Sequence, residues 1–81
     1  MNYFKNIVNA INYIEKNIDN EFSLQQVADV AGFSLHHFHR IFQRVIGLSL
    51  KSYIRRRRLT EAETELLNSD KKIISIAFDY Q

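Results

Sequence analysis

The sequence lacks several features that define other classes of protein. It contains no cysteine, which excludes a disulfide framework and a thiolate metal site. No apolar run approaches the roughly 20 residues that a membrane-spanning helix requires. The N-terminal segment also lacks the basic start and the continuous apolar run of a signal peptide. We therefore expect a soluble, cytoplasmic protein.

Proline and glycine, the residues that interrupt helices, are nearly missing. The 81 residues include no proline and only two glycines, Gly32 and Gly47. This composition favours helices joined by short turns. The length allows one small domain, and an apolar fraction of 46% with 25% charged residues is typical of a globular chain rather than a disordered one.

Negative charge is missing from the middle of the chain. Between Val30 and Thr60 there is no Asp or Glu, and all three histidines fall in this acid-free block. Its seven basic residues are Arg40, Arg44, Lys51, Arg55, Arg56, Arg57 and Arg58. A block of one sign indicates an anionic partner such as nucleic acid or a membrane surface, and four consecutive arginines favour a partner over a merely solvated face.

Apolar spacing and capping residues predict the first two helices. A stripe of apolar side chains predicts a helix over about residues 3–18. Ser23 then precedes a short amphipathic segment and has Gln26 three positions later, which is the pattern of a capping box. We expect Gly32 to end this second helix with a positive φ.

Two further helices follow from the same kind of signal. Ser34 is expected to cap the third helix and Gly47 to end it. Ser49 is expected to cap a longer helix over about 50–68, whose apolar stripe drifts from one face to another. A last short helix is expected to begin near Ile73, where the spacing of apolar residues repeats that of the second helix.

The third predicted helix has two different faces. Its apolar side groups Leu35, Phe38, Ile41, Phe42 and Val45, whereas its polar side groups His36, His39, Arg40 and Gln43, with His37 and Arg44 at the flanks. A short helix, a glycine turn and a two-faced helix together are typical of a helix-turn-helix. In that motif the second helix enters the major groove of DNA.

The polar side of this helix carries side chains suited to reading bases. Arg40 can bond bidentately to guanine and Gln43 to adenine, and His36 and His39 can donate, accept or stack. We expect these four residues to contact base edges. Phosphate contacts are expected from Ser23, Ser34, His37, Arg44, Arg55, Arg56 and Arg57. Arg58 shares the Ile54–Ala62 face and is expected to be partly buried and paired.

The motifs resemble one family of bacterial regulators. The segment "FSLQQVADVAGFSLHHFHRIFQRVIGLSLKSYIRRRRLTEAETELL" resembles the first DNA-binding half of the AraC/XylS family, and "IISIAFDY" resembles the opening of that family's second helix-turn-helix. The resemblance implies an all-α fold in which a long linker helix joins two helix-turn-helix units. On this basis we expect a homeodomain-like three-helix unit at 1–48, the linker helix at 49–68 and the start of a truncated second unit at 69–81.

The resemblance also implies partners. Double-stranded DNA is the expected partner, RNA polymerase is a second candidate, and an effector ligand would bind only through a domain that is not in these residues. No cofactor is expected. Two departures from the family pattern stand out, because Gln81 takes the place that Gly32 has in the first copy, and the second recognition helix is missing. We therefore expect the chain to be a fragment.

Other classes of site fit the sequence less well. His36 and His39 could share a zinc ion, but that face offers no cysteine and no third ligand. Catalysis by histidine lacks a serine or acidic partner on the same face, so we expect no enzyme. The better rival is a helical protein-interaction domain whose basic face binds an acidic partner or an anionic membrane surface.

Overall fold

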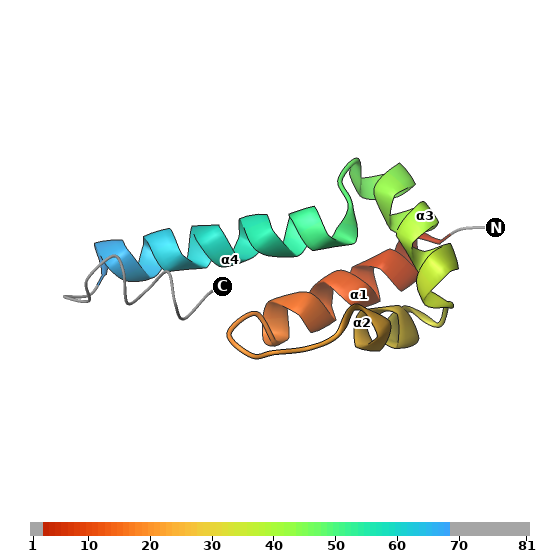
Figure 1. The fold of residues 1–81 in the computed structure, drawn as a ribbon, viewed down its shortest axis with the longest axis horizontal. Helices are drawn as coiled ribbons and strands as arrows, with labels where there is room; N and C mark the ends of the chain where they lie inside the picture. The colour runs from red at the N-terminus through yellow and green to blue at the C-terminus, as the bar shows by residue number, and fades with distance from the viewer. Residues whose placement is uncertain (1–2, 69–81) are drawn as a thin grey trace.

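Four helices make up most of the fold in a computed structural model that describes residues 3–68 (Figure 1). They are α1 (Phe4–Lys16), α2 (Leu24–Ala31), α3 (Leu35–Ile46) and α4 (Leu50–Leu67). Residues 3–68 contain no strand, which confirms the all-α prediction. The helix expected near Ile73 lies outside the described residues, so it stays a prediction.

The first helix ends two residues before the predicted position. Asn17 has non-helical backbone angles (φ −114°, ψ 16°), and its side-chain amide donates to the carbonyl oxygen of Tyr13 at 2.8 Å. The backbone N–H of Asn17 donates to the same carbonyl at 3.2 Å, so Asn17 ends the helix with two bonds to Tyr13. Ile18 follows outside the helix and is nevertheless buried, so the apolar pattern continues into the loop.

The second helix has the start and the end that the sequence predicts. Ser23 Oγ accepts from the backbone N–H of Gln26 at 3.1 Å, and Gln26 Oε1 accepts from the backbone N–H of Ser23 at 2.8 Å. Gly32 has φ 83°, and the N–H of Phe33 donates to the carbonyl oxygen of Ala28 at 3.1 Å. The capping box and the left-handed glycine end are both confirmed.

Similar local bonds begin and end the remaining helices. Ser34 Oγ accepts from the N–H of His37 at 3.2 Å at the start of α3, which ends at Gly47 with φ 85°. Ser49 Oγ accepts from the N–H of Ser52 at 3.1 Å at the start of α4. The three-residue turn between α2 and α3 gives the predicted helix-turn-helix.

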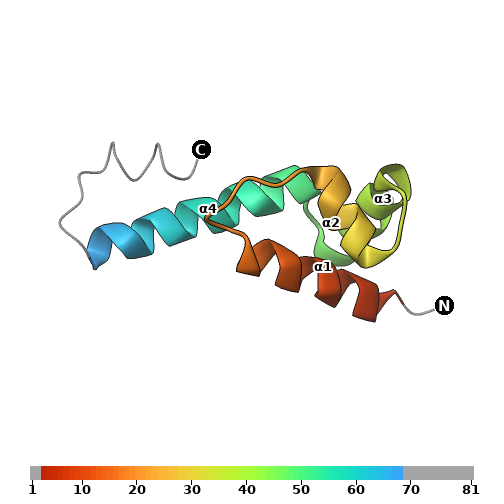
Figure 2. The same ribbon diagram turned by 90° about the horizontal axis from the view of Figure 1, so that it is seen from below.

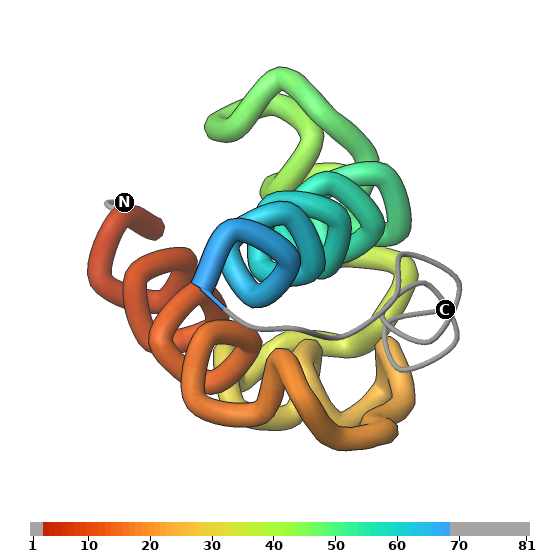
Figure 3. The backbone as a smooth tube through the Cα atoms, turned by 90° about the vertical axis from the view of Figure 1, so that its left-hand side faces the viewer, coloured from red at the N-terminus to blue at the C-terminus, as the bar shows by residue number. Residues whose placement is uncertain are grey.

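One apolar cluster holds the first three helices and the start of α4 together. Its buried members are Ile7, Ala10, Ile14, Ile18, Val27, Ala28, Ala31, Phe38, Ile41, Phe42, Leu50 and Ile54. Phe38 and Phe42 are fully buried, and burial of a large apolar side chain stabilises a fold by about 1.5–3 kcal/mol. Figure 3, which looks along α4, shows α1, α2 and α3 arranged around this helix. The side-chain amide of Asn6 joins α1 to the carbonyl oxygen of Ala31 at 2.9 Å.

Two predicted apolar stripes are narrower than the sequence suggests. Val45 was expected on the packed face of α3, but 48% of it is exposed. The prediction is wrong because the packed face is centred on Phe38 and Phe42, which leaves Val45 at its edge. In α1, Ile7 and Ile14 belong to the buried stripe, and Phe4, at the edge of that stripe, is 64% exposed.

The fourth helix begins in the core and then leaves it. Leu50 and Ile54 are buried, and the Tyr53 ring meets the Phe42 ring edge-on with centroids 5.5 Å apart. No residue of α4 beyond Ile54 is buried, and Leu67 is 84% exposed. Figures 1 and 2 show this half of α4 extending away from the other helices. The division into units at 1–48 and 49–68 fits this arrangement but stays a prediction.

Candidate nucleic-acid interface

The polar face of α3 points away from the core. His36, Arg40 and Gln43 are exposed and His39 is half-buried, whereas Phe38 and Phe42 fill the opposite side. None of these four polar side chains has a hydrogen bond or ion pair with any residue from 3 to 68. The buried side of α3 therefore fixes the helix, and the donors on its exposed side are unused.

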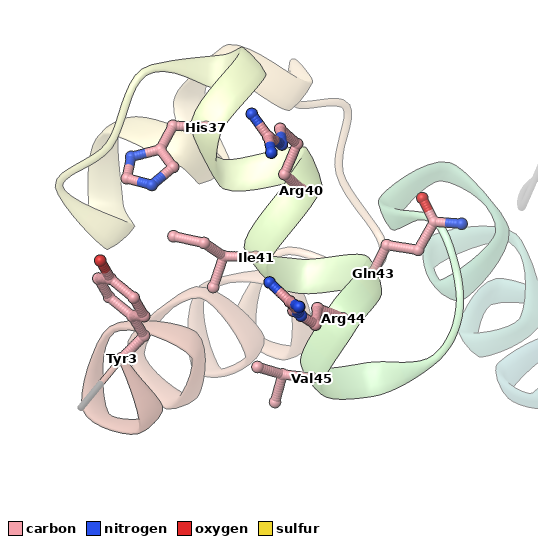
Figure 4. Close-up of a pocket in the computed structure, with 7 residues that line it drawn as sticks. All are labelled: Tyr3, His37, Arg40, Ile41, Gln43, Arg44 and Val45. Atoms are coloured by element: carbon pink, nitrogen blue, oxygen red, sulfur yellow. The ribbon is translucent and has the colours of Figure 1, made fainter. Parts of the chain in front are cut away.

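An open hollow lies between the start of α1 and the flank of α3. It has a volume of about 740 Å³, and Figure 4 shows the seven residues that line it: Tyr3, His37, Arg40, Ile41, Gln43, Arg44 and Val45. We call it the α1–α3 hollow. Four of its residues are predicted DNA contacts. Among the described residues that line it, only Tyr3 lies outside α3. Gln43 projects away from Tyr3 (Figure 4).

Two arginines of α4 are exposed and have no ionic partner in the described residues. Arg55 and Arg56 are both exposed, and neither forms an ion pair within residues 3–68. Unpaired guanidinium groups are the donors that bind phosphate best, because they are always charged and present a fork of N–H groups. Their exposure agrees with the predicted role at the DNA backbone.

Arg57 differs from Arg55 and Arg56 because it has ionic partners within the fold. Its Nε donates to Glu15 Oε2 at 2.9 Å, and its Nη2 donates to Glu15 Oε1 at 2.7 Å and to Glu61 Oε1 at 2.8 Å. The residue was expected at a phosphate, but two carboxylates already occupy the guanidinium. The local sequence offers Glu61, four residues on, but it does not show the pairing with Glu15, which lies 42 residues away.

The pairing of Arg57 changes the ionisation of nearby groups. The hydrogen bonds from Arg57 lower the pKa of Glu15 below its ordinary value of 4.5. The hydrogen bond to Glu15 is the main cause that raises the pKa of Arg57, so this guanidinium is charged at any relevant pH. Burial, reinforced by the charge of Glu15, raises the pKa of Tyr53. These shifts indicate a structural ion pair rather than a reactive site.

Arg58 is partly buried and bonded, as predicted. Its Nη2 donates to the carbonyl oxygen of Asn20 at 3.0 Å, and its guanidinium carbon lies 5.1 Å from the centroid of the Phe22 ring. A cation over an aromatic face is attracted to the ring's electron density. Arg57 and Arg58 therefore hold α4 against α1 and against the α1–α2 loop, respectively.

The two serines expected at phosphates are both exposed at helix starts. Ser23 caps α2 and Ser34 caps α3, and each hydroxyl oxygen already accepts a backbone N–H. The remaining N–H groups of each first turn and the hydroxyl protons stay available to an anion. The structure thus leaves the predicted role of these serines open.

The described residues hold no other recognisable kind of site. No group of three or more His, Cys, Asp or Glu residues in the range 3–68 could hold a metal ion. In the same range, no helix is both long and apolar enough to cross a membrane.

Comparison with protein families places this geometry in a known class. Residues 27–81 match the helix-turn-helix domain family, so the chain is a helix-turn-helix protein. It belongs to the AraC/XylS family of DNA-binding transcription regulators, whose members are generally not enzymes. The predicted family resemblance is confirmed.

Several curated relatives are similar over nearly the whole chain. An uncharacterised HTH-type transcriptional regulator of Bacillus subtilis, YbfP, is 46% identical over 81 residues, which cover 100% of this chain and 28% of that protein. The transposon Tn10 TetD protein of Escherichia coli is 44% identical over 75 residues, covering 93% and 54%. The multiple antibiotic resistance protein MarA of Escherichia coli is 35% identical over 74 residues, covering 91% and 58%. The chain thus spans about a quarter to somewhat over half of the length of these relatives.

A solved structure has the same fold. The crystal structure of a transcriptional regulator with an AraC-type DNA-binding domain from Chromobacterium violaceum superposes with a TM-score of 0.85 at 25% identity. The match covers 94% of this chain and 68% of that one. This agreement confirms the predicted fold class.

Proposed function

We propose that this chain binds double-stranded DNA sequence-specifically, with α3 in the major groove. The observation that supports this most strongly is the two-sidedness of α3. Its buried side is fixed by Phe38 and Phe42, and its exposed side presents unpaired side chains of the types that hydrogen-bond to bases. The major groove admits one helix and displays a distinct pattern of donors and acceptors for each base pair.

In this function the residues of α3 have separate roles. Arg40 lies at the centre of the exposed face and bonds bidentately to guanine, and Gln43 does the same to adenine. His36, one turn before Arg40, and the half-buried His39 complete the base-reading set. The N-terminal turns of a recognition helix are the part that reaches base edges.

Phosphate contacts come from the residues that surround this face. They are Ser23, Ser34, His37, Arg44, Arg55 and Arg56, all of which are exposed. Arg57 leaves this set, because a phosphate would have to displace two carboxylates from its guanidinium. These contacts supply affinity that falls as salt rises, whereas the bases supply specificity.

The role in transcription follows from the family. We propose that the protein carrying this chain regulates transcription from the cytoplasm, with RNA polymerase as a further partner and an effector bound by another domain. The second DNA-binding unit, at 69–81 and beyond, would lie outside the described residues. These proposals depend on the family and not on any contact in the structure.

Binding of the 81-residue chain to labelled duplex DNA, followed by fluorescence anisotropy at several salt concentrations, tests the proposal. We expect the logarithm of the affinity to fall linearly with the logarithm of salt. Selection from random duplexes should then return a preferred site, and Arg40→Ala should change that site at one base pair, at a loss of about 1–3 kcal/mol. Arg55→Ala should weaken all sequences alike and reduce the salt slope by about 1.

A matched control separates a local contact from a change in net charge. Lys16→Ala removes one positive charge from an exposed position at the end of α1 and should leave both slope and site unchanged. If a folded chain binds an acidic protein or anionic vesicles but selects no DNA site, the rival interaction domain is correct. An unchanged site for Arg40→Ala would show that another face reads the bases.

A further inference from the structure

Tyr3 is the residue of the α1–α3 hollow for which the sequence offers no role. Its ring meets the Phe33 ring edge-on with centroids 5.4 Å apart and the His37 ring with centroids 6.1 Å apart. The ring is half-buried, but the hydroxyl has no hydrogen-bond partner among residues 3–68. A phenol that is fixed by its ring and left with an unused hydroxyl is a preorganised donor.

The surroundings of this hydroxyl define what it can bind. The hollow combines an apolar wall, from Ile41 and Val45, with the cationic side chains of Arg40 and Arg44. Figure 4 shows Tyr3, His37 and Ile41 on the same side of α3, facing a common space. None of the described residues that line the hollow has a carboxylate, so the potential that they create there favours an anion.

A strand of the DNA backbone can bind both the apolar and the cationic side chains of the hollow. Its phosphate oxygens accept hydrogen bonds from a phenol and from a guanidinium, and its deoxyribose presents apolar C–H groups. A free anion would use the cationic side chains but would gain nothing from Ile41 and Val45. The hollow also flanks the face that is proposed to enter the major groove, where a sugar–phosphate strand must pass.

We propose that the α1–α3 hollow is a binding site for one sugar–phosphate strand of the DNA and that the Tyr3 hydroxyl donates a hydrogen bond to a phosphate in it. The deoxyribose packs against Ile41 and Val45, and Arg44 contacts the same strand. Because α1 and α3 hold the strand from two sides, Tyr3 fixes the rotation of α3 in the groove. This inference rests on the proposed function, since it requires α3 to lie in the major groove.

Tyr3→Phe removes the hydroxyl and keeps the ring contacts, so it tests the site without disturbing the fold. We expect the variant to unfold at the same temperature as the wild type and to bind every duplex about three- to tenfold more weakly, as for the loss of one hydrogen bond. The salt slope should not change, because a neutral hydroxyl releases no counterions. Arg44→Ala, in contrast, should reduce that slope by about 1.

Tyr13→Phe is the matched control. Tyr13 lies in α1, the helix that Tyr3 precedes, and is also half-buried. It meets the Phe22 ring edge-on with centroids 5.9 Å apart and does not line the hollow. Removal of the Tyr13 hydroxyl should leave the affinity for DNA unchanged. Duplexes that each carry one neutral methylphosphonate in place of a phosphate should then identify the contacted phosphate. At that position alone, Tyr3→Phe should cause no further loss of affinity relative to the wild type on the same duplex.

The outcomes distinguish this inference from the proposed function. If the wild type selects a DNA site that Arg40→Ala alters, but Tyr3→Phe binds like the wild type at every phosphate, the inference is overturned and the proposed function stands. If the wild type binds no DNA, both fail. A loss of affinity for Tyr3→Phe that no single methylphosphonate abolishes would also overturn the direct contact.

Discussion

Arg57 and Glu15 are joined by two hydrogen bonds of 2.9 and 2.7 Å, although 42 residues separate them in the sequence. The pair joins the middle of α4 to the last part of α1, one turn beyond Ile54, the last buried residue of α4. It is therefore the first fixed point on α4 outside the apolar core. Glu61, one turn further on, adds a third bond to the same guanidinium at 2.8 Å.

Removing this pair should cost measurable stability. Both side chains are partly exposed, at 27% and 36%, so solvent screening limits the expected loss for Arg57→Ala to about 1 kcal/mol. Glu15→Gln should lose a similar amount, and the double variant should lose less than the sum. A double-mutant cycle in urea measures this coupling. Arg56→Ala, an exposed neighbour, should leave the unfolding midpoint nearly unchanged, and equal losses for Arg56→Ala and Arg57→Ala would argue against the pair.

The same pair predicts a dependence of stability on pH. Arg57 lowers the pKa of Glu15 in the folded state below 4.5, so the folded chain binds this proton less readily than the unfolded chain does. The stabilisation is therefore complete above about pH 4.5 and is lost as pH falls through the lowered folded pKa. The difference in urea midpoint between wild type and Glu15→Gln should shrink between pH 7 and about pH 3. The pH dependence should be absent when the same comparison is made in the Arg57→Ala background, where Glu15 has lost this partner.

Two positions on α3 should respond very differently to truncation. Phe42 is fully buried against Phe38 and Tyr53, so Phe42→Ala should destabilise the fold by about 3–5 kcal/mol. Val45 was expected on the same face but is 48% exposed, so Val45→Ala should cost less than about 1 kcal/mol. Thermal unfolding followed by circular dichroism measures both. Similar losses at the two positions would mean that α3 is rotated from its position in the structure.

The glycine that ends each helix of the helix-turn-helix should resist replacement. Gly32 has φ 83° and Gly47 has φ 85°, and a Cβ at either position would meet no atom within 4 Å. Any loss for Gly32→Ala or Gly47→Ala should therefore come from backbone strain alone, about 1–2 kcal/mol. Asn tolerates this conformation better, so Gly32→Asn should lose less. Chemical denaturation of the three variants gives the comparison, and a tolerated Ala would show that the turn takes another conformation.

Much of the fold could be predicted from the sequence because its signals are local. The cap at Ser23 needs only Gln26, three residues away, and the left-handed end at Gly32 needs only the absence of a Cβ. The exposure of Val45 could not be predicted, because it depends on how far α1 covers α3. Helical periodicity gives the direction of a side chain but not the width of the surface that buries it.

The candidate site also combines features that the local sequence predicts with contacts that it does not predict. The exposed face of α3 follows from its spacing of polar and apolar residues, and the partial burial of Arg58 followed from the face it shares with Ile54. The pairing of Arg57 with Glu15 and the position of Tyr3 beside α3 depend on contacts between distant segments. Four adjacent arginines look equivalent in the sequence, but a helix directs them differently by about 100° per residue.

The half of α4 that leaves the core is held to the rest of the fold by Arg57, through Glu15, and by Arg58, through Asn20 and Phe22. Each helical residue advances about 1.5 Å along the axis, so Leu67 lies about 15 Å beyond Arg57. A tilt of about 10° at Arg57 would displace the end of α4 by about 3 Å. The bond between Arg57 and Glu15 therefore limits how far the end of α4 can move relative to α1.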